Sequence, residues 1–251
     1  MVYFVGAGPG AEDLITVRGM NLLKKADVVI YAGSLVNPKL LGYCRPETEI
    51  HNSAKMTLDE VLSVIYKAEE NGKMTVRLHT GEPSIYGAVR EQMDSLDAKK
   101  IKYESVPGVS ACFGAAASLN LEFTLPEVSQ TLIITRMEGK TSVPQTEKIA
   151  SLAAHRASMA VYLSAGLTEM LSAELVKGGY SEKTPAAIVY KATWQDEEKY
   201  ICTVGTLAKT AKEHNITKTA VILVGDAVTH SVYAKSRLYA PDFETEFRKR
   251  K

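Results

Sequence analysis

The chain has 251 residues, of which 45% are hydrophobic and 24% are charged, and its formal net charge at pH 7 is +1. No apolar run reaches the ~20 residues of a membrane-spanning helix, and the balanced charge excludes the broad basic surface typical of nucleic-acid-binding proteins. The opening MVYFVG has no basic segment, which argues against a signal peptide. We therefore expect a cytoplasmic protein that binds neither membranes nor nucleic acids.

The first half of the chain alternates short apolar runs with amphipathic stretches. The runs are rich in β-branched or aromatic residues and are bounded by Gly, Asp or Pro, which predicts strands. The segment 57–71 has apolar positions on one helical face, and Thr57 and Glu60 have capping-box spacing, which predicts a helix. This alternation predicts a mostly parallel sheet covered on both faces, with ligands bound at the carboxyl ends of its strands. The predicted strands are 2–5, 28–31, 74–78 and 103–106.

A second set of elements follows a polar segment around Pro126, which comes after a predicted helix at 110–119. The later strands are predicted at 131–135, 159–163, 186–190, 200–203 and 220–224, with helices at 168–177 and 206–214. Two of these strands are too close in sequence for a helix between them, which predicts a mixed sheet. The fold class is therefore α/β. The predicted domains are 1–122 with the glycine-rich loops, 123–241, and a basic tail at 242–251.

The motif GAGPGA at 6–11 has the spacing of a dinucleotide-binding fingerprint. That fingerprint begins a helix inside the motif and places an acidic residue at the end of the second strand. Here Pro9 and a polar segment precede the best helix cap, Thr16, and no acid follows Tyr31. The sequence therefore predicts a rigid, side-chain-poor wall at the end of a strand rather than a phosphate cradle.

Two further loops have the same character. HTGEPS at 79–84 and VPGVSA at 106–111 each follow a predicted strand, so the three loops meet in one pocket if the strands are neighbours. His79 either faces this pocket or makes a structural hydrogen bond, and the sequence leaves both open. The chain has no G-x-S-x-G, H-E-x-x-H or C-x-x-C motif, so we expect neither a hydrolase nor a metal site.

Five motifs occur in order along the chain: VGAGPGAEDLITVRG, YAGSLV, HTGEPSIYGA, VPGVSA and TRMEGKTSVP. Together they resemble the tetrapyrrole methyltransferases of siroheme and cobalamin synthesis, over about residues 1–240. YAGSLVNPKLL, HTGEPSIYG and TRMEGKTSVP are most similar to the branch of that family that methylates carbon 11 of cobalt-precorrin-4. The resemblance implies a homodimer of two α/β domains, with the co-substrate S-adenosylmethionine bound in the cleft between them.

The resemblance also implies which residues contact S-adenosylmethionine. They match the family's contact positions and are mostly small or apolar, which suits a ligand whose hydrogen-bonding edges are met by main-chain groups. In the first half they are Pro9, Thr80, Gly81, Glu82, Ile85, Ser110 and Ala111, and in the second half Leu163, Ala187 and Ala192.

Two positions depart from the family pattern. The commonest loop in the family is Gly-Asp-Pro, whereas this chain has Glu82 in the place of the Asp, so a side-chain role does not carry over directly. The uroporphyrinogen branch has an Asp, implicated as a base, after the Tyr of the second strand. Here Ala32 follows Tyr31, which favours the corrin branch.

The implied reaction is an in-line displacement, in which an electron-rich ring carbon attacks the sulfonium methyl and releases S-adenosylhomocysteine. Positioning and the exclusion of water then account for most of the catalysis, and the weak candidates for a catalytic side chain are His79, Glu82 and Arg136. The tetrapyrrole carries many carboxylates, which cations near the motifs can bind. The candidate substrate contacts are Gly8, Arg18, Lys55, Arg90, Arg136, Lys140 and Lys191.

Three alternatives stay open. The first is the same chemistry on cobalt-free precorrin-4, or at another ring carbon of a precorrin or uroporphyrinogen. A methyltransferase of the same fold that acts on a macromolecule is disfavoured by the near-zero net charge. A dinucleotide-binding module is disfavoured by the missing acid.

Overall fold

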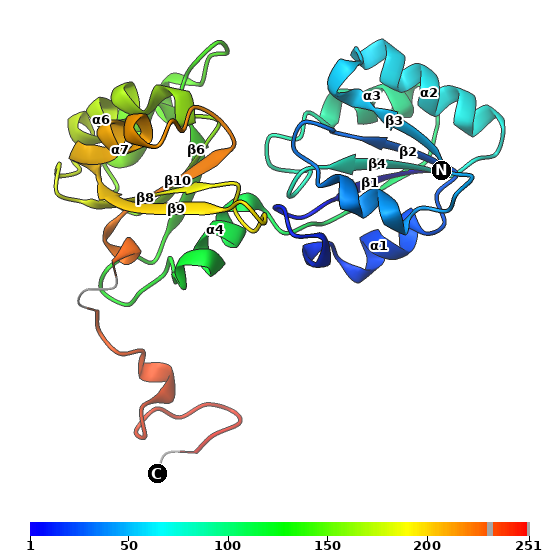
Figure 1. The fold of residues 1–251 in the computed structure, drawn as a ribbon. Coiled ribbons are helices and arrows are strands. Elements are labelled where there is room, and N and C mark those ends of the chain that lie inside the picture. The colour runs from blue at the N-terminus through cyan, green and yellow to red at the C-terminus, as the bar shows by residue number, and fades with distance from the viewer. Residues whose placement is uncertain (230–232, 250–251) are drawn as a thin grey trace. The chain divides into compact units, whose positions relative to one another are not determined.

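The computed structural model describes residues 1–229 and 233–249, so the last two residues of the predicted basic tail lie outside it. The chain forms two compact units, which are coloured along the sequence in Figure 1. The first unit comprises Met1–Ala115 and Lys191–Glu198, and the second comprises Ala116–Tyr190 and Lys199–Lys251. No helix among the described residues is long and apolar enough to cross a membrane.

The first unit holds a five-stranded sheet in the order β3-β2-β4-β1-β5, and every neighbouring pair is parallel. Its strands are β1 (Val2–Gly6), β2 (Val28–Tyr31), β3 (Glu49–Asn52), β4 (Thr75–His79) and β5 (Tyr103–Val106). Its helices are α1 (Val17–Leu23), α2 (Leu58–Glu70) and α3 (Arg90–Ala98). The predicted parallel sheet is therefore confirmed.

Successive residues of each strand point to opposite faces of this sheet, and both faces are covered. Val5 of β1 packs in a buried cluster with Leu23 of α1, whereas Phe4 packs with Ile65 of α2 and Leu96 of α3. Figure 1 shows α1 on one side of the sheet and α2 and α3 on the other. Because helices cover both faces, the loops at the two ends of the strands are the parts of this unit that remain for binding a ligand.

Local sequence signals explain where two helices begin. The Thr16 side chain accepts a hydrogen bond from the backbone N–H of Gly19, which caps α1. Thr57 and Glu60 form the reciprocal capping box at the start of α2. Both signals were readable in the sequence, and the first confirms that α1 begins beyond the glycine motif.

The second unit holds a sheet in the order β6-β7-β10-β8-β9. β6 is parallel to β7, and β10 is antiparallel to both β7 and β8, which confirms the predicted mixed sheet. Its strands are β6 (Leu132–Arg136), β7 (Ser158–Tyr162), β8 (Pro185–Tyr190), β9 (Glu198–Thr203) and β10 (Ala220–Val224). The remaining helices are α4 (Ala111–Leu119), α5 (Ile149–Ala153), α6 (Thr168–Lys177) and α7 (Leu207–Glu213).

The sequence pattern did not predict β3 or α5. β3 is a polar strand at the sheet edge, and its apolar residue Ile50 is 44% exposed, so it lacks the apolar run that marks a strand. α5 has only five residues, too few for a helical period to stand out.

Candidate functional site

The glycine motif at 6–11 and the loop after β4 are joined through their backbones. β4 and β5 flank β1 in the sheet, so the three predicted loops leave the same edge side by side. The Ala7 N–H donates to the His79 carbonyl at 2.7 Å, and Gly8 and Gly81 exchange two N–H···O bonds of 3.3 and 2.9 Å. This confirms the predicted convergence of the loops, and it commits the Gly8 backbone to Gly81.

The third loop, after β5, contacts the other two where all three carry glycine. A Cβ placed on Gly6 would lie 2.5 Å from the Cα of Gly108, and one on Gly108 would lie 2.2 Å from the carbonyl oxygen of Gly81. Real Cβ atoms do not approach backbone this closely, so only glycine fits at these positions. The three loops therefore form one continuous surface built from backbone.

The Glu82 carboxylate ties two of these loops together. One oxygen accepts from the Gly108 N–H at 2.8 Å, and the other accepts from the Ser84 N–H at 3.0 Å. Partial burial acts to raise the pKa of Glu82, but the Gly108 and Ser84 hydrogen bonds outweigh it and hold the pKa below its usual value. Glu82 is therefore an ionised brace of the loops.

A fourth segment, 191–198, connects β8 to β9 and belongs to the first unit. The Trp194 indole N–H donates to the Pro9 carbonyl at 3.1 Å. The Ala11 N–H donates to the Thr193 hydroxyl at 3.0 Å. Ala192 therefore lies in the same unit as Pro9. Sequence reasoning missed Thr193 and Trp194, although the only tryptophan of the chain stands two residues after Ala192.

Two polar side-chain atoms at and just after the end of β4 are buried without a hydrogen-bond partner among the described residues: the Nε2 of His79 and the hydroxyl oxygen of Thr80. Burial, assisted by the charge of Arg77, lowers the pKa of His79 to about 3. The imidazole is 4% exposed and lies 6.1 Å from the Phe4 ring, centroid to centroid. It is neutral at physiological pH, and its burial argues against acid–base catalysis, while its Nε2 makes no structural hydrogen bond to the described residues.

The other predicted cofactor contacts lie in both units. Ser110 is buried, Ala111 begins α4 and Ile85 is half-buried, all in the first unit. In the second unit, Leu163 directly follows β7 with a φ of 54° and is 68% exposed, whereas Ala187 is fully buried in β8. Their role toward a cofactor stays a prediction.

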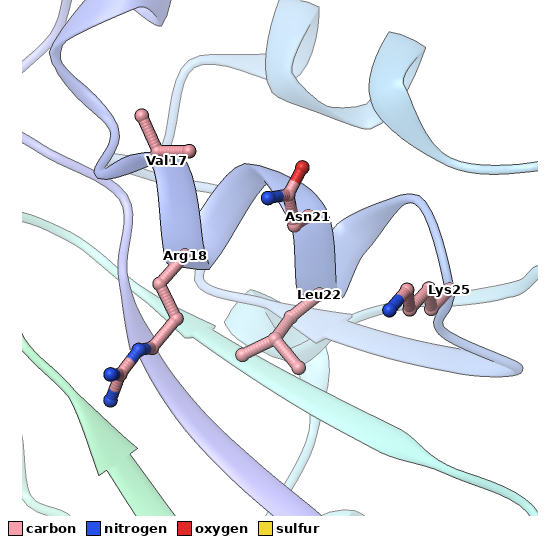
Figure 2. A pocket seen from close by; sticks show the side chains of 5 residues that line it. All are labelled: Val17, Arg18, Asn21, Leu22 and Lys25. Atoms are coloured by element: carbon pink, nitrogen blue, oxygen red, sulfur yellow. The ribbon is translucent and has the colours of Figure 1, made fainter.

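The candidate substrate cations are dispersed, and most have local partners. Arg18 lies on α1, where it lines a shallow cavity of about 390 Å³ (Figure 2) and pairs with Glu104 at 3.3 Å. Arg90 pairs with two aspartates of α3, and the Arg136 guanidinium donates to carbonyls of the loop that follows β6. Lys191 pairs with Asp196 in the segment 191–198. Lys55 and Lys140 are exposed.

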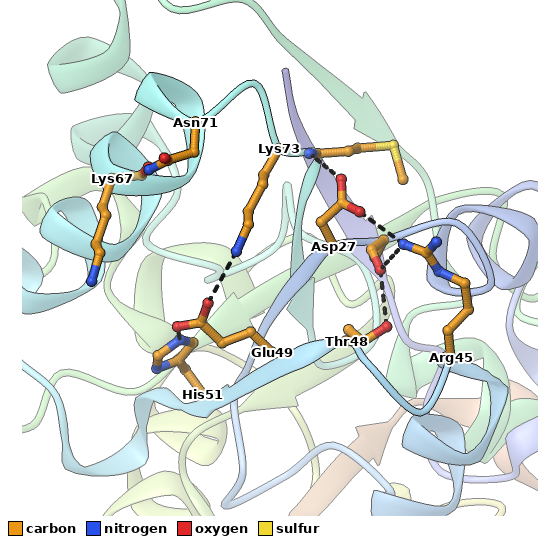
Figure 3. A network of polar contacts seen from close by, with 10 residues as sticks. Asp27, Arg45, Thr48, Glu49, His51, Lys67, Asn71 and Lys73 are labelled. Carbon is orange, nitrogen blue, oxygen red and sulfur yellow. Dashed lines mark hydrogen bonds and ion pairs between the residues drawn. The ribbon is translucent and has the colours of Figure 1, made fainter.

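A separate polar cluster lies at the opposite, amino end of the parallel sheet (Figure 3). The Asp27 carboxylate accepts from the Met74 N–H and from Arg45, both at 2.8 Å. Glu49 contacts His51 at 2.8 Å and Lys73 at 3.7 Å beside a cavity of about 280 Å³. These contacts join charged and polar side chains of neighbouring segments, which is typical of a surface that contributes to stability.

The five sequence motifs and the backbone-built loops agree with one family. A model of that family, described as Tetrapyrrole (Corrin/Porphyrin) Methylases, matches residues 1–208. The chain belongs to this family. It is therefore a methyltransferase, as the resemblance implied.

Tetrapyrrole methylases similar to the chain have been named from several organisms. The cobalt-precorrin-4 C(11)-methyltransferase of Methanocaldococcus jannaschii is 51% identical over 248 residues, which are 99% of this chain and 96% of the relative. The precorrin-4 C(11)-methyltransferase of Mycobacterium tuberculosis is 42% identical over 240 residues, covering 95% and 96%. A solved cobalt precorrin-4 methyltransferase superimposes with a TM-score of 0.89 at 45% identity, covering 90% of this chain and 95% of that one. The two-domain α/β fold is thereby confirmed.

Proposed function

We propose that the chain transfers the methyl group of S-adenosylmethionine to carbon 11 of cobalt-precorrin-4. The observation that carries this proposal is the 51% identity, over 99% of the chain, to a relative named for that reaction. Membership of the tetrapyrrole methylases and the fold shared with a solved cobalt precorrin-4 methyltransferase support it.

The residues at the carboxyl end of the parallel sheet fit S-adenosylmethionine. The glycines leave a surface without side chains, and the buried Thr80 hydroxyl has no partner among residues 1–229 and 233–249, so it is available to a ligand. The groups of the first unit that would hold the co-substrate are Pro9, Thr80, Gly81, Ile85, Ser110, Ala111 and Ala192.

Bound S-adenosylmethionine supplies an activated methyl group, so the chain need not activate a leaving group. His79 is neutral and buried, and both Glu82 oxygens accept backbone N–H bonds, which leaves neither group poised for proton transfer. The backbone-joined loops instead hold a fixed geometry. We infer that the chain accelerates the reaction by positioning methyl and ring carbon and by excluding water.

The carboxylates of the macrocycle require cations. Lys55 and Lys140 are exposed, and Arg136 joins β6 to the loop that carries Lys140. Replacement of Arg136 by Gln is expected to weaken macrocycle binding more than cofactor binding. Equal loss of both, or no loss, would contradict that role.

A second candidate is the same methylation on cobalt-free precorrin-4. The relative from Mycobacterium tuberculosis, whose name gives precorrin-4 and does not mention cobalt, is 42% identical over 95% of the chain. The higher identity to the cobalt-named relative favours cobalt-precorrin-4.

One experiment tests the reaction and the choice of substrate. Purified protein is incubated with methyl-labelled S-adenosylmethionine and precorrin-4, with and without cobalt, and NMR locates the new methyl. We expect label at carbon 11 and faster turnover of the cobalt form. Label at another carbon, or no transfer to either form, would overturn the proposal.

We also propose that the chain forms a homodimer, which the family resemblance implies, and that it is located in the cytoplasm. Sedimentation velocity tests the dimer, and cell fractionation tests the compartment. A monomer at micromolar concentration would contradict the first, and recovery outside the cytosolic fraction would contradict the second.

A further inference from the structure

We propose that Trp194 is a positioning residue that holds the Pro9–Gly10 stretch of the glycine motif in its ligand-binding conformation. This inference rests on the proposed function, because it assigns Trp194 a role at the predicted S-adenosylmethionine site. Trp194 was not among the residues that the resemblance carried over. The contacts of the segment 191–198 within the first unit indicate this role for Trp194.

Side chains from two distant segments hold three consecutive residues of the motif. The Pro9 carbonyl accepts from the Trp194 indole N–H at 3.1 Å, and the Gly10 carbonyl accepts from the Asn37 amide at 2.9 Å. The Ala11 N–H donates to the Thr193 hydroxyl at 3.0 Å. Residue 9 is a proline and has no N–H of its own, so its carbonyl is the only backbone hydrogen-bonding group through which it can be anchored.

The Trp194 side chain also packs closely against the glycine motif. A Cβ on Gly10 would lie 2.1 Å from the Cδ1 of Trp194, so the indole lies directly on the glycine backbone. A Cβ on Gly114 of α4 would lie 2.9 Å from the Pro9 ring and 3.1 Å from the Thr193 methyl. Pro9 therefore packs against α4 and the segment 191–198.

The segment that presents Trp194 is itself held in an unusual conformation. Thr193 has a φ of 69° and Lys191 a φ of 45°, and a β-branched residue rarely adopts the left-handed region. The Thr193 N–H donates to the Glu197 carboxylate at 2.5 Å, and the Lys191 ammonium lies 5.7 Å from the centre of the Trp194 ring. Strained backbone that persists because its surroundings hold it is typical of functional sites.

These contacts predict how Trp194 acts on ligand binding. A loop that is already in its bound conformation loses less conformational entropy when the ligand arrives, so the affinity is higher. Removing the indole N–H frees the Pro9 carbonyl and broadens the ensemble of the loop. The effect falls on the affinity for the co-substrate rather than on the chemical step.

The test compares the wild type with Trp194→Phe, which keeps an aromatic ring and removes the N–H donor. We expect the Kd for S-adenosylhomocysteine, measured by calorimetry, to rise about tenfold, which corresponds to one hydrogen bond. The maximal rate at saturating S-adenosylmethionine should change less than threefold. Because the chain has one tryptophan, wild-type fluorescence should also change during the titration with the same midpoint.

The matched control is Tyr66→Phe on α2, which likewise removes one side-chain donor to a backbone carbonyl, that of Ser95 at 3.4 Å. Its Kd for S-adenosylhomocysteine should equal that of the wild type. A Trp194→Phe Kd within twofold of the wild type overturns the inference, as does an equal rise in Tyr66→Phe. A wild type that does not bind S-adenosylhomocysteine overturns the proposed function itself.

Discussion

The two ends of the parallel sheet in the first unit are held together by different kinds of contact. At the carboxyl end, backbone contacts backbone through Gly6, Gly81 and Gly108, and the Glu82 carboxylate accepts N–H bonds from the loops. At the amino end, charged side chains form the contacts, and they are partly exposed, as for Arg45 and Asp27 at 41% and 38%.

Because the contacts differ, we expect the two ends to tolerate amino-acid substitutions to different degrees. Backbone contacts have no side chain that can move aside, so an added atom must displace a loop. Partly exposed ion pairs are screened by water and contribute little each, so the loss of one is tolerated. We therefore expect substitutions at the carboxyl end to affect stability and ligand binding together, and those at the amino end to affect stability alone.

The largest expected effect is that of Gly108→Ala. The new methyl would meet the Gly81 carbonyl at 2.2 Å, which cannot be relieved without separating two loops. We expect a loss of about 3 kcal/mol in the free energy of unfolding. We also expect the loss of measurable S-adenosylhomocysteine binding. Urea denaturation and calorimetry measure the two quantities.

Gly42→Ala is the control for this substitution, because a Cβ at Gly42 meets no atom within 4 Å and its φ is not positive. It should change the stability by less than about 0.5 kcal/mol. Normal ligand binding by Gly108→Ala would show that the close approach of the loops is unimportant.

The next effect is a pH dependence that comes from His79. Its pKa is about 3 in the folded chain and ~6.5 when unfolded, so between these values only the unfolded chain takes up a proton. Stability is therefore complete above pH ~6.5 and declines as the pH falls, by up to about 1.4 kcal/mol per pH unit. His79→Gln should flatten this slope between pH 6.5 and 4.5 in urea denaturation, whatever its effect at pH 7. An unchanged slope would show that His79 protonates in the folded chain.

Much of the fold could be read from the sequence. Apolar runs identified β1, β2 and β4, and the spacing of Thr57 and Glu60 predicted the start of α2. The pattern failed where tertiary contacts decide the structure, because β3 is a polar edge strand whose place depends on its pairing with β2.

The candidate site divides in the same way. The glycine-rich loops after strands are local patterns that the sequence reveals. They converge because the strands that they follow are neighbours in the sheet. The contact between Trp194 and Pro9 joins residues 185 positions apart, and no local pattern announces it. Likewise, Arg136 looked like a free substrate cation in the sequence, although its guanidinium donates to the carbonyls of Met137, Thr141 and Ser142.

A smaller effect is expected for Glu82→Gln. The amide keeps one acceptor oxygen but loses the charge, so one of the two N–H groups is left unpaired, at a cost of about 1 to 2 kcal/mol. Because the pKa of Glu82 is lowered on folding, this stabilisation is present above the unfolded value of ~4.3 and is lost as the pH falls through the folded value.

The measurements for Glu82→Gln are urea denaturation at pH 7 and the Kd for S-adenosylhomocysteine, and both should worsen. Glu70→Gln at the exposed end of α2 removes the same charge from the same unit, and it should change neither. If both variants behave alike, net charge rather than the bond to Gly108 explains the loss.

The smallest effect is expected at the amino end, for Asp27→Asn. The Met74 N–H and the Arg45 guanidinium lower the pKa of Asp27, so its stabilisation is present above pH ~3.9 and is lost as the pH falls through the folded value. Because both partners are partly exposed, we expect a loss of at most about 1 kcal/mol at pH 7, and less in high salt. The Kd for S-adenosylhomocysteine should stay within twofold of the wild type. A larger rise in that Kd would mean that the two ends of the sheet are coupled, and the division of labour between them would have to be abandoned.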